Sequence, residues 1–215
     1  MAASVITFSV QMGSDGTAIA RAVADKLGYR YYDQEITSQA AALVGVSPET
    51  MANAERRPSF IERMLERLAL ATVVSDGVVP APASTNPAVY TMTSSDYRQI
   101  IERVVTELAT RGDCVIVGHA GQAILKHEKI VLKVLVHGSQ EQRAQRVSKE
   151  TNIASAEALH LVKENDGQRA GFFKDAYNVD WLDSSLYDLT LNTDDVDPET
   201  AISLVLTSAK AAAAP

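Results

Sequence analysis

The strongest constraint on the fold is an almost continuously apolar run at residues 130–136, which reads Ile-Val-Leu-Lys-Val-Leu-Val. A strand in a sheet with one solvated face alternates apolar and polar residues, whereas a strand buried on both faces does not. Strands of the second kind occur chiefly in parallel sheets that helices cover on both sides. The run therefore predicts an α/β fold built on a parallel sheet.

The order of the other expected elements agrees with this prediction. Strands are expected at residues 4–10, 29–32, 114–117 and 187–192, and helices at residues 18–27, after Asp33, at 59–74, between Ser94 and Gly112, and at 139–150, 155–173 and 198–210. Strands separated by helices favour right-handed crossovers, with helices on both faces of the sheet. We predict a three-layer α/β architecture in one domain, residues 1–215.

Charge and apolar content limit the function. The chain carries 20 Lys and Arg residues against 27 Asp and Glu residues, which gives a net charge of −7. This sign disfavours nucleic acid and anionic membranes as partners, so any phosphate site must be local. The N-terminus lacks a signal-peptide pattern and no apolar run approaches the roughly 18 residues of a membrane helix, so we expect a cytoplasmic protein. Cys114, the single cysteine, is expected to be a buried structural residue.

A change of composition marks residues 75–93, which are rich in Ala, Ser, Thr and Pro. A loop of this length is unusual in a compact domain. It is compatible with a mobile element, a contact in a homo-oligomer or disorder. We predict that it is the most mobile internal part of the chain.

A glycine turn follows the first expected strand, with the sequence Gly13-Ser14-Asp15-Gly16-Thr17, and leads into a helix. Backbone N–H groups in such a turn, together with a helix N-terminus, can hold a nucleotide phosphate. The turn is not a complete Walker A motif, because no Lys lies near it. Asp15 would also repel a phosphate unless a metal ion or an Arg screens its charge. The pattern alone leaves an ordinary strand-to-helix turn open.

The turn and four later segments together resemble the cytidylate kinase-like family, relatives of the P-loop nucleoside monophosphate kinases. The segments lie at residues 6–33, 115–121 (Val-Ile-Val-Gly-His-Ala-Gly), 141–147, 166–169 (Asp-Gly-Gln-Arg) and 181–193. Their common order covers nearly the whole chain except residues 51–97. The resemblance implies a P-loop kinase fold with a helical acceptor-binding insertion at residues 34–112 and a lid-like helical segment at residues 151–180.

The resemblance also implies ATP and Mg²⁺ as cofactors and assigns roles to individual residues. The donor phosphates would be bound by Gly13, Ser14, Asp15, Gly16, Thr17 and Arg143, with the Thr17 hydroxyl on Mg²⁺; the catalytic residues would be Arg146, Arg169 and Asp166; and the acceptor side would include Asp33 and His119. Arg143 and Arg146 share a helix face by their spacing, so both are expected to reach a nucleotide phosphate.

Departures from the family pattern leave structural alternatives open. Gly16 stands at the place of the Walker Lys, and Val10, Asp15 and His119 stand where family members commonly have Arg, Gly and Arg. Without the resemblance, the two arginines of residues 141–147 read as a solvated helix face, Asp166 and Arg169 as a surface ion pair, and His119 as a structural residue. Trp181 and Tyr187 are expected to be packing residues.

Three functions fit these observations unequally. The first is ATP- and Mg²⁺-dependent phosphoryl transfer to a nucleoside monophosphate or a similar small phosphorylated acceptor. The second is a non-catalytic protein of the same fold that acts as a nucleotide sensor or binds a partner, motivated by Asp15 and the missing Lys. The third, a dinucleotide-binding Rossmann protein, is disfavoured because the turn lacks the Gly-x-Gly-x-x-Gly pattern.

Overall fold

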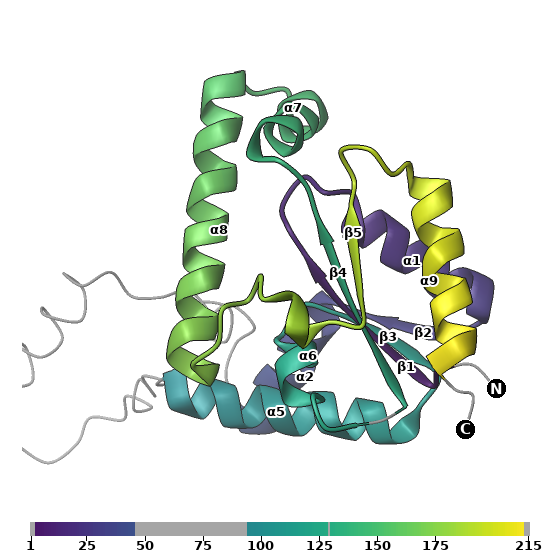
Figure 1. The fold of residues 1–215 in the computed structure, drawn as a ribbon. Helices are drawn as coiled ribbons and strands as arrows, with labels where there is room; N and C mark the ends of the chain where they lie inside the picture. The colour runs from purple at the N-terminus through teal and green to yellow at the C-terminus, as the bar shows by residue number, and fades with distance from the viewer. Residues whose placement is uncertain (1–2, 46–93, 129, 213–215) are drawn as a thin grey trace, which may run out of the picture.

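The computed structural model describes residues 3–45, 94–128 and 130–212 (Figure 1). The helix expected at residues 59–74 and the loop expected at residues 75–93 lie outside the described residues, so both stay predictions. The same holds for most of the insertion expected at residues 34–112.

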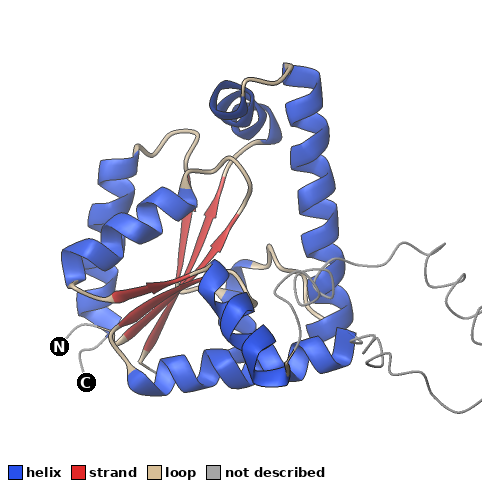
Figure 2. Cartoon of the chain, turned by 180° about the vertical axis from the view of Figure 1, so that it is seen from behind, coloured by secondary structure: helices blue, strands red, loops and turns tan. Residues whose placement is uncertain are grey.

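A five-stranded parallel sheet forms the centre of the fold (Figure 2). Its strands are β1 (Val5–Val10), β2 (Arg30–Tyr32), β3 (Cys114–Val117), β4 (Val131–His137) and β5 (Leu189–Asn192), in the order β2-β3-β1-β4-β5. The central strand β1 pairs with β3 on one side and with β4 on the other, and Val5 faces Cys114 and Val131. Strands β3 and β4 are mostly buried, which is the reason for their continuous apolar sequence.

Helices cover both faces of the sheet, as predicted. On one face α1 (Gly16–Leu27) and α9 (Pro198–Ala212) pack Ile19 and Val205 against Phe8. On the other face α2 (Gln34–Val44) and α5 (Ser94–Arg111) pack Ile36 and Ile101 in a second core cluster. The predicted three-layer α/β class is therefore confirmed. Cys114 is buried in the second cluster, which confirms that prediction too.

Two further helices, α7 (Gln140–Thr151) and α8 (Ser155–Tyr177), lie between β4 and β5 in the sequence. The first half of α8 packs on α7 through Val147 and Val162. Phe173, near the other end of α8, packs with Trp181, which follows that helix, against the short helix α6 (Gly121–Ile124). Helix α8 therefore runs along one side of the molecule from α7 to α5 (Figure 1).

Two short elements and one side chain differ from the prediction. Helix α6 and the 3₁₀ turn η1 (Ser184–Leu186) were not expected, because three or four residues are too few to show a periodicity. The sequence spacing puts Leu43 on one helix face with Ile36 and Ala40, which are buried, yet Leu43 is 54% exposed in the last turn of α2. No helix in residues 3–45, 94–128 and 130–212 has the length and apolarity to span a membrane.

Candidate active site

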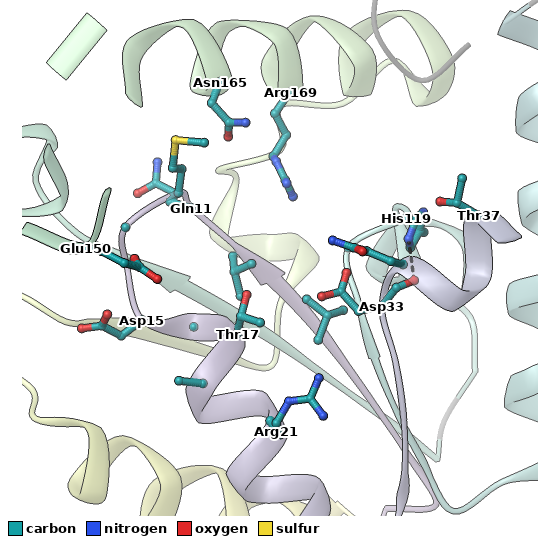
Figure 3. Close-up of a pocket in the computed structure, with 18 of the residues that line it drawn as sticks. Gln11, Asp15, Thr17, Arg21, Asp33, Thr37, His119, Glu150, Asn165 and Arg169 are labelled. Atoms are coloured by element: carbon teal, nitrogen blue, oxygen red, sulfur yellow. Dashed lines mark hydrogen bonds between the residues drawn. The ribbon is translucent and has the colours of Figure 1, made fainter. Parts of the chain in front are cut away.

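A cleft of about 1070 Å³ opens at the carboxyl ends of the strands, where the loops after β1 and β3 leave the sheet. Its walls come from the glycine turn, α1, the start of α2, the loop after β3, and α8 (Figure 3). Open α/β sheets bind their ligands in this place, because consecutive connections diverge there to opposite faces of the sheet. The cleft is therefore the candidate active site.

The glycine turn has the backbone of an anion cradle. Gly13 and Asp15 have φ angles of 75° and 59°, in the left-handed region. The Ser14 N–H donates to the Gln11 carbonyl at 3.1 Å, and helix α1 begins directly after Asp15. The N–H groups of the first turn of an α-helix have no partner inside the helix, so those of α1 face the cleft mouth as donors.

Close packing fixes the turn at its two glycines. A Cβ atom on Gly13 would lie 2.5 Å from the carbonyl oxygen of Arg143, and one on Gly16 would lie 2.4 Å from Cγ1 of Val10. Val10 thus fills the space that any side chain at position 16 would need. Gly at position 16, in place of Lys, therefore goes together with Val at position 10, because the Val10 side chain packs directly against residue 16.

Arg143 lies beneath the turn and is only 1% exposed. Its Nη1 donates to the Met12 carbonyl at 3.2 Å, its Nε donates to the Gly138 carbonyl at 2.9 Å, and both Nη atoms bind Asp166, at 3.1 and 2.7 Å. These contacts join the turn, the end of β4 and α8. The guanidinium is thus surrounded by protein acceptors, a geometry that favours a positioning role. Asp166 pairs with Arg143 across two helices, whereas the sequence suggested a local pair with Arg169.

Arg146 holds the glycine turn through an ion pair and a hydrogen bond. Its Nε lies 3.4 Å from Oδ2 of Asp15, and its Nη1 donates to the Gly13 carbonyl at 3.2 Å. The remaining donors bind the Thr193 hydroxyl and the Thr193 carbonyl. Arg146 is therefore the Arg that pairs with Asp15, while the Asp15 side chain stays 44% exposed.

The acceptor side of the cleft is organised around Asp33. The Tyr31 hydroxyl donates to Oδ2 of Asp33 at 3.3 Å, and burial together with the nearby Asp33 charge raises the pKa of Tyr31 to about 12. Nε2 of His119 lies 3.1 Å from the Asp33 carbonyl, so this nitrogen carries the proton. Two of the residues predicted for the acceptor, Asp33 and His119, are thus brought together at the ends of β2 and β3.

The loop that carries His119 is strained. Gly118, His119 and Ala120 have consecutive φ angles of 76°, 50° and 54°, all in the left-handed region. Non-glycine residues occupy this region at a cost, and such residues concentrate at functional sites. Among the described residues no hydrogen-bond partner is found for the buried Nδ1 of His119. Nδ1 is therefore a buried polar atom whose hydrogen-bonding capacity is unused within the described part of the chain.

Arg169 extends from α8 into the cleft (Figure 3). Its guanidinium carbon lies 5.4 Å from the centre of the Trp181 ring, which is 1% exposed. The Tyr187 hydroxyl donates to the Trp181 carbonyl at 2.6 Å and accepts from Nε2 of Gln122 at 3.1 Å. Trp181 and Tyr187 are packing residues, as expected, and Trp181 also contacts Arg169.

Sequence reasoning missed Arg21. It lines the cleft from α1, with its guanidinium carbon 4.1 Å above the Tyr31 ring (Figure 3). The signal was its position, because a residue four places after Thr17 on a helix shares the face of Thr17. Arg21 and Arg169 are the arginines that line the cleft in the described part of the chain, against the carboxylates of Asp15, Asp33 and Glu150.

The residues present fit a nucleotide phosphate and its Mg²⁺ ion. Thr17 is exposed on the first turn of α1 and lines the cleft. The hydroxyl of Ser14 is buried in the turn without a hydrogen-bond partner within residues 3–45, 94–128 and 130–212. The same residues hold no group of three His, Cys, Asp or Glu side chains suited to a metal ion. Mg²⁺ usually keeps several waters and binds substrate phosphates, so the phosphates would supply most of its ligands in this cleft, beside the Thr17 hydroxyl.

The sheet order and the glycine turn before α1 define the P-loop kinase fold. Solved structures agree. An uncharacterized protein from Eubacterium ventriosum ATCC 27560 superposes with a TM-score of 0.64 at 17% identity, over 95% of this chain and 96% of that chain. A gluconokinase from Sinorhizobium meliloti 1021 superposes with a TM-score of 0.50 at 15% identity, over 95% and 90%. These likenesses show the fold alone.

The sequence comparisons identify the family. The model of the cytidylate kinase-like family matches residues 5–195, and the chain belongs to this family. It is 26% identical to a cytidylate kinase of Methanocorpusculum labreanum over 190 residues, 88% of this chain and 86% of that protein. It is 34% identical to a cytidylate kinase of Methanocaldococcus jannaschii over 107 residues, which span 49% of this chain and 60% of the relative. The resemblance seen in the sequence is confirmed.

Proposed function

We propose that this chain is an ATP- and Mg²⁺-dependent phosphotransferase whose acceptor is a nucleoside monophosphate or a similar small phosphorylated molecule. The observation that carries the proposal is one cleft in which the anion-cradling turn faces Asp33, His119 and Arg169. Donor and acceptor groups of a kinase must meet in such a place. Family membership supports the same reaction class.

In this proposal an oxygen of the acceptor attacks the γ-phosphorus of ATP, and the bond from that phosphorus to the β–γ bridging oxygen breaks. Phosphoryl transfer needs mainly positioning and positive charge from the protein. The N–H groups of the turn from Gly13 to Thr17, apart from that of Ser14, which donates to Gln11, would hold the donor phosphates. Arg169 would donate to the transferring group. Mg²⁺, when bound through Thr17, would neutralise phosphate charge.

The remaining predicted residues take supporting roles. Arg143, Asp166 and Arg146 keep the turn in shape through the contacts described above. Asp33 and His119 would bind the acceptor, with Arg21 beside them. We extend the proposal to the segments: residues 34–112 as the acceptor-binding insertion and residues 151–180, which include Arg169, as the lid. A cytoplasmic location would supply the ATP.

A second candidate is a non-catalytic nucleotide sensor of the same fold. One observation favours it: the guanidinium groups of Arg143 and Arg146, the two arginines of α7, donate to acceptors of the protein itself. A kinase with this site would rely on Arg169 and Arg21 for positive charge.

One experiment separates the two candidates. The protein is titrated with ATP and with CMP in the presence of Mg²⁺, and the same mixtures are assayed for ADP and CDP. Binding with product formation supports the phosphotransferase with CMP as acceptor, and ADP formation only with another monophosphate would reassign the acceptor. Binding without any product supports the sensor. If no nucleotide binds, both candidates are wrong.

A further inference from the structure

Asp15 occupies an unusual place for a carboxylate. It is the residue directly before α1, with φ at 59°, yet its side chain makes no capping hydrogen bond to the helix. The side chain is 44% exposed and lines the cleft, with Glu150 beside it in Figure 3. A phosphate held by the turn would therefore meet a negative charge.

Within the described part of the chain, the ion pair of Asp15 is with Arg146 alone. Nε of Arg146 lies 3.4 Å from its carboxylate, while the other donors of Arg146 are fixed on Gly13 and Thr193. Arg146 therefore cannot turn its guanidinium to a ligand without releasing these contacts. A polyphosphate entering the turn therefore meets the Asp15 carboxylate without a new counter-charge from Arg146.

From this geometry we propose that Asp15 makes the turn selective for polyphosphate in complex with a divalent cation. The inference rests on the proposed function and adds a specificity-determining residue to it. A metal-free polyphosphate brings about four negative charges toward a carboxylate and is repelled. The metal complex carries less negative charge and presents a cation that the carboxylate attracts.

A matched substitution isolates the charge. Asp15→Asn keeps the size of the side chain, and Asn tolerates the left-handed backbone as well as Asp does. The comparison variant is Asp25→Asn, which changes net charge equally on an exposed position of the same helix, away from the cleft. Both variants are expected to keep the melting temperature of the parent, since an exposed ion pair contributes little to stability.

The test measures ATP affinity by calorimetry, with EDTA and then with excess Mg²⁺. The parent and Asp25→Asn should bind ATP at least about ten-fold more weakly in EDTA. Asp15→Asn should gain about ten-fold in EDTA, change little in Mg²⁺, and lose part of the gain at high salt.

The outcomes distinguish this inference from the proposed function. If Asp15→Asn binds metal-free ATP no better than the parent, or if Asp25→Asn gains equally, the inference is wrong while the nucleotide site stands. If the parent binds ATP in neither condition, the proposed function fails and the inference fails with it. A gain confined to Asp15→Asn in EDTA supports both.

Discussion

Arg143 and Asp166 form a two-pronged ion pair beneath the glycine turn, with N–O distances of 3.1 and 2.7 Å. The pair links α7 to α8 and lies where the turn rests on Arg143 through the Met12 carbonyl. Helix α8 and the glycine turn are therefore held by the same guanidinium. A displacement of α8 should therefore alter the conformation of the glycine turn, and the reverse should also hold.

Removing one member of this pair should destabilise the whole fold. Arg143→Ala leaves Asp166 without its partner and empties a buried site, which costs about 3–5 kcal/mol in the free energy of unfolding. Urea denaturation measures this loss. Arg103→Ala, on an exposed position of α5, serves as the control and should cost less than about 0.5 kcal/mol. A loss of nucleotide affinity at unchanged stability would instead assign Arg143 to direct ligand contact.

Val10 and Gly16 should behave as one unit. Gly16→Ala places a Cβ 2.4 Å from Cγ1 of Val10. Such overpacking should lower the free energy of unfolding by about 1–3 kcal/mol. Adding Val10→Ala removes Cγ1, the atom nearest to the new Cβ, although the Cβ of residue 10 stays 2.9 Å away. The double variant should therefore be more stable than the sum of the single changes predicts. Thermal unfolding of the four proteins gives the coupling energy. A coupling near zero would show that the two positions are independent.

Arg169 should supply the positive charge that the turn lacks. Arg169→Ala removes a charged donor from the cleft, with a loss of about 1.5–3 kcal/mol, or roughly ten- to a hundred-fold in nucleotide affinity or turnover. Arg169→Lys should restore little, because Lys lacks the planar group that stacks on Trp181. Unchanged binding and turnover in Arg169→Ala would overturn the assignment.

Arg146→Ala should lower affinity by a similar factor, but through the shape of the turn that it fastens. The control is Arg103→Ala, on an exposed position of α5 outside the cleft lining. If Arg146→Ala binds nucleotide as tightly as the Arg103→Ala control does, Arg146 does not set the shape of the turn.

Tyr31 should contribute to the loss of stability in alkali. Its pKa is raised from an ordinary value of 10.0 to about 12, so folding favours the protonated hydroxyl. This contribution is complete below pH 10 and is lost as the pH rises through about 12. Tyr31→Phe should therefore lose less stability than the parent between these two values, as followed by urea denaturation at each pH. Equal losses in both proteins would contradict this.

The sequence by itself determined the sheet and the place of the site. The apolar run of β4 required a strand buried on both faces, and a glycine turn between a strand and a helix can only present its amides at the carboxyl edge of a parallel sheet. The family followed from the order of short motifs. Local patterns suffice for these conclusions because they depend on neighbours along the chain.

Only the tertiary structure decided which charges reach the cleft. Arg143 and Arg146 are three residues apart on one helix, yet one is buried beneath the turn and the other fastens it at Asp15. Arg21, without a motif of its own, lines the cleft. A guanidinium has five donors and a long flexible stem, so its hydrogen-bond partners are the acceptors that tertiary packing brings near it. Many of these acceptors are backbone carbonyls, which every residue has, so no sequence pattern can predict them.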